Sequence, residues 1–203
     1  MVSPPHPPFP PALSLPSTSN TTYRHAFSEE FQIGRTHIVP GLLKTLSNNR
    51  AISMRTGVKL FEVTDVLLLD ASSDVGARNE RHAAVVYTGP TAGMEIVHGI
   101  VDRIFALLEI PPRPFSWEAG KPDDFGKHAL RYFVEPTEDV PSFFPGRGAR
   151  IFIEDAAGKK TAVGAMGVVH PKVLANYELV FPASMLELNI EPLVGGGGAS
   201  RVA

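Results

Sequence analysis

Two β-type segments in the last third of the chain constrain its fold more than any other feature. The segments ARIFIED (149–155) and TAVGAMGVV (161–169) are rich in β-branched and small residues, and only the short AAGKK segment separates them. A link this short joins neighbouring strands as a hairpin, because a parallel crossover needs a much longer connection. The sequence therefore predicts a sheet that is at least partly antiparallel.

Other segments predict further strands and a smaller number of helices. The segment VKLFEVTDVLLLD (58–70) predicts a long, largely buried strand, and HAAVVYT (82–88) predicts a second one after a loop. Shorter strands are predicted at LRYFV (130–134) and at SMLELNIE (184–191). Strands that outnumber helices, with a hairpin among them, are typical of an α+β fold.

Three segments predict helices, and prolines mark their limits. RTHIVPGLLKTLSNNR places Pro40 near a first helical turn and buries three leucines, and HPKVLANYEL begins with Pro171 after a histidine. The clearest helix is TAGMEIVHGIVDRIFALLEI (91–110), which Pro111 and Pro112 end. The apolar stripe predicted for this helix consists of Ile96, Val97, Ile100, Val101, Ile104, Leu107 and Leu108.

Composition excludes several classes of protein and outlines one domain. Cysteine is absent, which excludes disulfides, thiolate zinc sites and cysteine nucleophiles, and the net charge of −2 gives no sign of a broad nucleic-acid surface. No apolar run is long enough to span a membrane. Residues 1–28 are rich in Pro and Ser and are predicted to be disordered, 29–193 to fold, and the Gly-rich 194–203 to be a flexible tail. Prolines and a single arginine, Arg24, disfavour a transit peptide at the start.

The motifs predict no catalytic, cofactor-binding or metal site. A nucleophile elbow, a dinucleotide-binding loop and a Walker loop are all missing from the sequence. Glu95, His98 and Asp102 share one helix face, but a di-metal site of that kind needs a second such motif, so we interpret them as a solvated face. His170 precedes a helix start, where capping or packing is expected rather than catalysis.

The charged segment RNERH (78–82) is one candidate contact with a partner. We place it on a loop, where Arg78 and Arg81 are suited to bidentate contacts with phosphate or carboxylate groups. A solvated loop without such a contact is the competing interpretation.

The segment SFFPGRGARIFIE (142–154) is the other candidate, and it includes Phe144, Gly146 and Arg147. Phosphate-binding loops lie between a strand and a helix, whereas this segment leads into a strand. We therefore predict a tight entry into the hairpin, with phenylalanine packing and an unusual φ at glycine. Arg147 is the charged side chain of this turn and the residue of the segment that we take as a candidate contact with a partner.

Several segments together resemble one family, the beta subunit of phenylalanine–tRNA ligase, in its C-terminal catalytic-like core domain. They run in family order from about residue 31 to residue 193. DVGARNERH together with MEIVHG resembles the cytosolic eukaryotic or archaeal type. The other segments that carry the resemblance are RTHIVPGLLKTLSNNR, VKLFEVTDVLLLD, FFPGRGARIFIE, VGAMGVVHPKVLANYEL and LELNIE.

The resemblance implies an α+β, class II aminoacyl-tRNA synthetase-like core: a mainly antiparallel sheet, flanked by helices, that has lost the catalytic motifs. Arg131 comes nearest to the class II Arg-x-Glu motif, but its glutamate, Glu135, follows four residues later rather than two. The implied role is a non-catalytic scaffold for the alpha subunit in a cytoplasmic heterotetramer. ATP and Mg²⁺ would act in the holoenzyme, and tRNA(Phe) would be reached through it.

Family beta subunits are long and carry upstream domains for editing and for magnesium binding. Only a short proline-rich segment precedes the resemblance here, so we expect neither property in this chain, which is consistent with a truncated product or a paralogue. Two alternatives stay open. In the first alternative, the chain is a stand-alone binding or regulatory module that kept the fold. In the second, it is a self-sufficient enzyme, and the absence of the class II motif arginines argues against that alternative.

Overall fold

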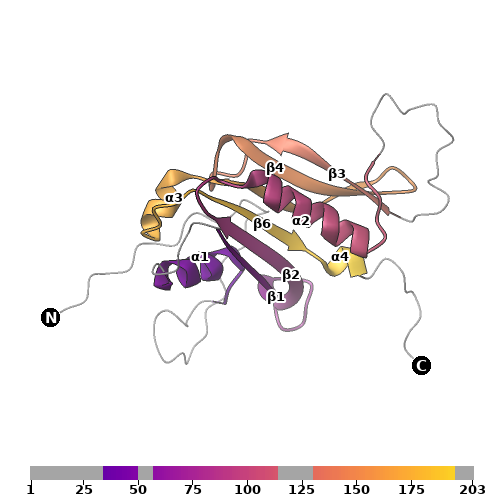
Figure 1. Ribbon diagram of the computed structural model, residues 1–203. Coiled ribbons are helices and arrows are strands. Elements are labelled where there is room, and N and C mark those ends of the chain that lie inside the picture. The colour runs from indigo at the N-terminus through magenta and orange to yellow at the C-terminus, as the bar shows by residue number, and fades with distance from the viewer. Residues whose placement is uncertain (1–33, 50–56, 114–129, 195–203) are drawn as a thin grey trace.

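One sheet with helices on both of its faces makes up the protein in a computed structural model that describes residues 34–49, 57–113 and 130–194 (Figure 1). The elements in chain order are α1 (Val39–Asn48), β1 (Val58–Leu69), β2 (Ala77–Thr88), α2 (Met94–Leu107), β3 (Leu130–Thr137), β4 (Phe143–Asp155), β5 (Lys160–Val169), α3 (Pro171–Asn176), β6 (Ala183–Asn189) and α4 (Glu191–Val194). This arrangement confirms the predicted α+β class.

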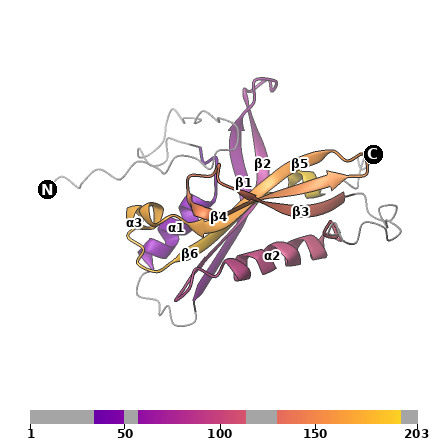
Figure 2. The same ribbon diagram turned by 90° about the horizontal axis from the view of Figure 1, so that it is seen from above.

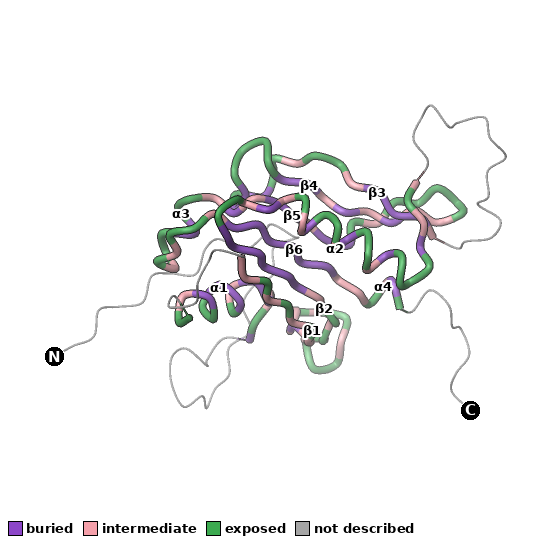
Figure 3. The backbone as a smooth tube through the Cα atoms, viewed as in Figure 1, coloured by how far each residue is buried: buried purple, intermediate pink, exposed green. Residues whose placement is uncertain are grey.

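The sheet has six strands in the order β1-β2-β6-β5-β4-β3, and every neighbouring pair is antiparallel. The predicted hairpin is confirmed as β4 and β5, which pair up to Glu154 and Lys160 beside the turn. The last strand of the chain, β6, lies between β2 and β5. It is buried along almost its whole length (Figure 3), because it has a strand on each side and helices above and below.

The sheet separates two hydrophobic cores. Helices α1 and α3 pack on one face with Val66, Val86 and Met185, whereas α2 packs on the other face with Val85, Leu186 and other strand residues. Figure 2 shows α2 apart from α1 and α3, with the strands between them. Alternating strand residues therefore point to different helices, which is why β2 and β6 are apolar on both faces.

The helices α1 and α3 form where the sequence predicts them. Proline lies in the first turn of α1 and begins α3, where its missing N–H removes no helical hydrogen bond. Leu42, Leu43 and Leu46 of α1 are buried, as predicted.

Two predictions about β1 and β2 are wrong. Strand β1 lies at the edge of the sheet and its side chains alternate, so Phe61 is 78% and Val63 54% exposed rather than buried. Strand β2 begins at Ala77, which places RNERH on a strand and not on a loop. The charged start of β2 extends the hairpin because each residue has a partner on β1, as in the pair Asp65 and Arg81.

The buried face of α2 is rotated from the predicted stripe. Val97, Val101 and Phe105 are fully buried, whereas Leu107 is 67% exposed. Phe105 stacks on Tyr132 of β3 with ring centroids 4.2 Å apart. The helix ends at Leu107, and Glu109 then takes a positive φ of 57° before the two prolines. An aromatic pair therefore defines the centre of this core.

Some predictions fall on parts of the chain that the structure does not describe. These are the disordered N-terminal segment, most of the irregular segment after Pro112, and nearly all of the Gly-rich tail. Val194, which we assigned to the tail, belongs to α4. Among the described residues, every helix is too short or too polar to cross a membrane.

Candidate functional site: a buried carboxylate–histidine cluster

The segment Phe143–Gly148 lies inside β4 and forms a bulge, rather than a turn before the strand. Phe143 pairs with Val169 and Gly148 pairs with Gly167, so the residues between them face a single residue of β5. Gly146 has a φ of 69°, which confirms the expected unusual backbone angle at glycine. The bulge bends the strand and presents its polar atoms to solvent.

The side chains around the bulge divide between packing and exposure. Phe144 is 45% exposed, and its ring centroid lies 6.3 Å from that of His170. His170 caps α3: its Nδ1 accepts a hydrogen bond from the backbone N–H of Lys172 at 3.1 Å. The predicted capping role of His170 is confirmed. Arg147 is exposed, and we find no ion pair for it with any described residue.

The two arginines of RNERH bind carboxylates of the same hairpin. The guanidinium of Arg81 donates to both oxygens of Asp65, at 2.7 and 3.2 Å, and this contact lowers the pKa of Asp65. Arg78 lies 3.4 Å from Asp70 and also pairs with Glu80. These contacts lie on a solvent-exposed ribbon and stabilise the extended hairpin only modestly.

A cluster of buried polar groups lies under α1, around Glu187 of β6. The carboxylate of Glu187 accepts hydrogen bonds from the backbone N–H groups of Ile38 and Val39, at 3.2 to 3.3 Å. The first turn of α1 has no cap from its own side chains. Glu187 of β6 therefore caps α1 from the sheet face that this helix covers. Its negative charge lies at the positive end of the helix dipole.

Two histidines complete the contacts of this carboxylate. His82 Nδ1 lies 3.0 Å from Glu187 Oε1, while its Nε2 lies 3.3 Å from Glu80 Oε2. His37 Nδ1 lies 3.4 Å from Glu187 Oε1, within the distance of an ion pair. Asn189 donates its amide to Glu80 at 2.9 Å. The cluster is thus a chain of groups that links β2, β6 and the start of α1.

Burial and pairing act in opposite directions on these groups. Burial alone would raise the pKa of Glu187, but the close contacts and charges of His37 and His82 outweigh it and lower the pKa to about 2. Burial would likewise lower the pKa of His82, yet its hydrogen bonds to Glu187 and Glu80 raise that pKa above the ordinary value. Both shifts favour a charged pair, because each ring nitrogen of a protonated His82 can donate to a carboxylate.

The contacts of this cluster have a structural role rather than a catalytic one. A general base needs room for a substrate, whereas both oxygens of Glu187 already accept from the backbone and from imidazole. Sequence reasoning missed the cluster. Glu187, a charged residue within the otherwise apolar strand β6, is the local signal, and the strand pattern alone does not show what its carboxylate contacts.

The other residues considered from the sequence lie apart from this cluster. His98 and Asp102 lie on a half-exposed flank of α2, 3.7 Å apart, and Asp102 accepts a hydrogen bond from Tyr132 at 2.9 Å. Arg131 is buried on β3 opposite Glu154. In the described part of the chain, acidic and histidine side chains nowhere form a group of three or more that could hold a metal ion.

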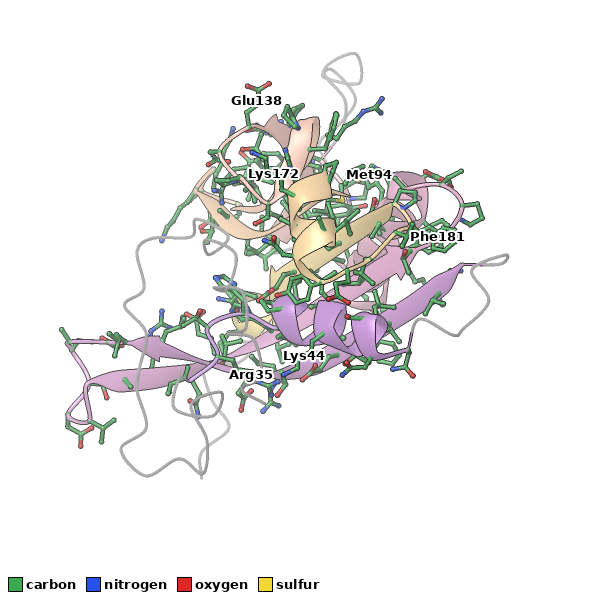
Figure 4. The ribbon with its side chains drawn as sticks, turned by 90° about the vertical axis from the view of Figure 1, so that its left-hand side faces the viewer. Arg35, Lys44, Met94, Glu138, Lys172 and Phe181 are labelled. Atoms are coloured by element: carbon green, nitrogen blue, oxygen red, sulfur yellow. The ribbon has the colours of Figure 1, made fainter. Side chains whose placement is uncertain are left out.

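Two further arginines are paired across the structure. Arg35, labelled in Figure 4, donates to Glu62 Oε1 at 2.8 Å and to Thr64 Oγ1 at 2.6 Å on β1. Arg150 of β4 donates to both oxygens of Asp139, at distances between 2.7 and 3.2 Å. Most arginines on the sheet therefore have a carboxylate of this chain as their partner.

Comparison with known proteins shows the family to which this chain belongs. The model of the phenylalanyl tRNA synthetase beta chain CLM domain matches residues 14–190. The chain therefore belongs to this family of synthetase beta-chain domains.

Curated relatives agree with that assignment. The phenylalanine–tRNA ligase beta subunit of Mus musculus is 39% identical over 182 residues, which is 90% of this chain and 27% of the relative. The Drosophila melanogaster beta subunit is 44% identical over 81% of this chain and 25% of the relative. The relative from Arabidopsis thaliana, at 38% identity over 82% of this chain and 26% of its own length, is described as cytoplasmic. The chain spans about a quarter of the length of the relatives it matches.

Proposed function

We propose that the chain is the non-catalytic core of a phenylalanine–tRNA ligase beta subunit and that it scaffolds the alpha subunit. Its antiparallel sheet, flanked by helices on both faces, is consistent with a class II synthetase-like core. In this role the alpha subunit carries ATP, Mg²⁺ and phenylalanine, and tRNA(Phe) is bound by the assembled heterotetramer in the cytoplasm.

The pairing of the arginines is the observation that carries this proposal. Catalysis on ATP needs arginines that are available to phosphate oxygens. Here Arg35, Arg78, Arg81 and Arg150 each contact a carboxylate of the chain, and the buried acid Glu187 caps a helix. The polar groups of the sheet thus stabilise the fold, which suits a scaffold better than an active site.

Exposed residues at the bulge are the proposed partner contacts within this role. Phe144 presents an aromatic ring beside His170, and Arg147 extends from the bulge at Gly146 into solvent. Arginine and aromatic residues are enriched at interfaces. Replacement of Arg147 by alanine is expected to weaken assembly and to leave the ATP affinity of the holoenzyme unchanged.

Co-expression with the matching alpha subunit, followed by size-exclusion chromatography, tests the proposal. We expect the two chains to elute together, and we expect the purified chain alone to form no aminoacyl-adenylate from ATP and phenylalanine. Separate elution at micromolar concentration would overturn the scaffold role. Adenylate formation by the chain alone would show that it is an enzyme.

A further inference from the structure

Strand β1 forms a long, regular edge of the sheet that carries exposed apolar side chains. In the described part of the chain it pairs with β2 alone, over 12 residues and without a bulge. Phe61 and Val63 of this strand are 78% and 54% exposed. Edge strands of natural proteins are usually short, bulged or interrupted by proline, because a free edge recruits another strand. An edge without these features is therefore a candidate interaction surface.

The backbone groups of this edge point outward at alternate residues. Leu67 donates its N–H to the carbonyl oxygen of Arg35 at 2.9 Å, so the backbone groups of Leu67 point away from β2. Because backbone direction alternates along a strand, the N–H and C=O groups of Phe61 and Val63 also point outward. None of the described residues forms a backbone hydrogen bond with them. The stretch of β1 before Leu67 can therefore accept another strand.

The sequence of β1 is complementary to itself in an antiparallel pairing centred on Glu62. In that register Phe61 of one copy lies opposite Val63 of the other. Lys59 lies opposite Asp65 in the same way, and a twofold axis repeats both pairs. Pairs of an aromatic with a β-branched residue, and pairs of opposite charge, stabilise neighbouring strands. The outward backbone groups of the two copies also face each other in this register, so they can exchange hydrogen bonds.

The charged groups near the axis are compatible with this pairing. Glu62 would face its own copy, but Arg35 of the same chain donates to its Oε1 at 2.8 Å and neutralises it. Asp65 accepts from Arg81 at 2.7 and 3.2 Å. A carboxylate has about four acceptor positions, so Lys59 of the second copy can join the contact between Asp65 and Arg81.

We propose that β1 is the contact through which two copies of this chain pair edge to edge, so that the sheet continues across a twofold axis. A closed twofold contact uses the same surface of both copies, which the self-complementary pattern of β1 provides. Edge pairing relies on backbone hydrogen bonds and a few side chains, so the interface is small and the dimer reversible. The inference goes beyond the scaffold function and does not depend on it.

Cysteine cross-linking tests the register, because the chain has no cysteine of its own. In the proposed pairing Glu62 faces its own copy as a non-hydrogen-bonded pair with Cα atoms about 4.5 Å apart, within the span of a disulfide. Glu62→Cys should therefore give a disulfide-linked dimer under mild oxidation. Thr64→Cys is the matched control, because Thr64 also contacts Arg35 from the same strand. Its two copies would lie about 13 Å apart along the strand, too far for a disulfide.

Sedimentation velocity of the full chain measures the dimer itself. We expect a reversible equilibrium of monomer and dimer for the unmodified chain. Phe61→Lys should weaken dimerisation by roughly tenfold or more, as for an interface hot spot. Val75→Lys should leave it unchanged, because Val75 is 77% exposed in the turn of the same hairpin, beyond the proposed pairing. Both replaced side chains are exposed, so both variants should keep the melting temperature of the unmodified chain.

Four outcomes would overturn the proposal. One is an unmodified chain that stays monomeric up to about 1 mM, and another is equal dimerisation by Phe61→Lys. A third is cross-linking of Thr64→Cys in place of Glu62→Cys, which would contradict the register. The fourth is a chain that is monomeric alone but binds the alpha subunit through Phe61, which would assign the edge to that subunit. The scaffold function has its own test in the co-elution of the two subunits, so it stands or falls separately.

Discussion

His82 on β2 and Glu187 on β6 form a buried pair, with 3.0 Å between Nδ1 and Oε1, and this pair holds the start of α1 against the sheet. The same carboxylate oxygens receive the first backbone N–H groups of α1. Loss of charge on either partner therefore affects the helix as well as the sheet. The cluster couples three elements that are far apart in the sequence.

The stability of the fold should be greatest at mildly acidic pH. Glu187 has an ordinary pKa of 4.5 and a pKa of about 2 when folded, so its contribution is present above pH 4.5 and is lost as pH falls toward 2. The pKa of His82 is raised from 6.5, so its contribution is complete below pH 6.5 and is lost as pH rises through the raised value. The cluster thus stabilises most between about pH 4.5 and 6.5.

Melting temperatures of the unmodified chain and of His82→Gln, measured by circular dichroism from pH 3 to 9, check this window. The difference between the two proteins should be largest at about pH 5 to 6 and should shrink on both sides. A difference that stays constant with pH would contradict the charged state assigned to the pair.

Glu187→Gln should destabilise the fold without changing its shape. The substitution removes a buried charge, leaves His82 facing a neutral amide, and weakens the cap of α1, so we expect a loss of about 3 kcal/mol in the free energy of unfolding. Urea denaturation measures it. Glu138→Gln, at the exposed position labelled in Figure 4, removes the same charge and should change the free energy by less than about 0.5 kcal/mol. Similar urea midpoints for Glu187→Gln and Glu138→Gln would contradict the stabilising role assigned to the cluster.

Alanine at Gly167, which lies on β5 opposite the bulge, and alanine at Gly146, which lies inside the bulge, should have unequal effects. A Cβ at Gly167 would lie 2.6 Å from the ring of Phe143 and 2.8 Å from the carbonyl oxygen of Arg147, so overpacking should cost about 2–3 kcal/mol. A Cβ at Gly146 would contact nothing, and only the positive φ opposes it, at about 1 kcal/mol. In thermal unfolding, Gly167→Ala should have a lower melting temperature than Gly146→Ala. The reverse order would show that the bulge does not have this geometry.

Phe105 should be among the most sensitive positions of the α2 core. It is fully buried and stacks on Tyr132, so Phe105→Ala should destabilise by about 3–5 kcal/mol. Tyr132→Phe keeps the stack and loses only the hydrogen bond to Asp102, which contributes about 1 kcal/mol. Denaturant titration compares these with the exposed control Leu107→Ala, expected within about 0.5 kcal/mol. A large loss at Leu107 would favour the stripe predicted from the sequence.

Local patterns predicted most of the elements. The β4–β5 hairpin follows from its short link, and α1 and α3 follow from proline in the first turn, because each signal depends only on residues close in the chain. The burial of β1 was not predictable in this way. Phe61 and Val63 have the composition of a core strand, and their exposure depends on β1 lying at the edge of the sheet, which is a property of the topology.

The cluster around Glu187 was hidden for the same reason. Glu187 lies 149 residues from the N–H of Ile38 that it binds, and 105 residues from His82. No spacing rule reaches so far. The charges of Arg78 and Arg81 predict an anionic partner, yet each contacts a carboxylate of its own hairpin, and the register of β1 with β2 decides that pairing.

The central place of β6 has a consequence for how the chain is made. During synthesis β1 and β2 leave the ribosome early and β3 to β5 later, but the two groups have no shared edge until β6 emerges and pairs with β2 and β5. The same strand delivers the cap of α1. A nascent chain released before Glu187 would hold two incomplete sheets with unpaired edges, a state open to aggregation and to chaperone binding.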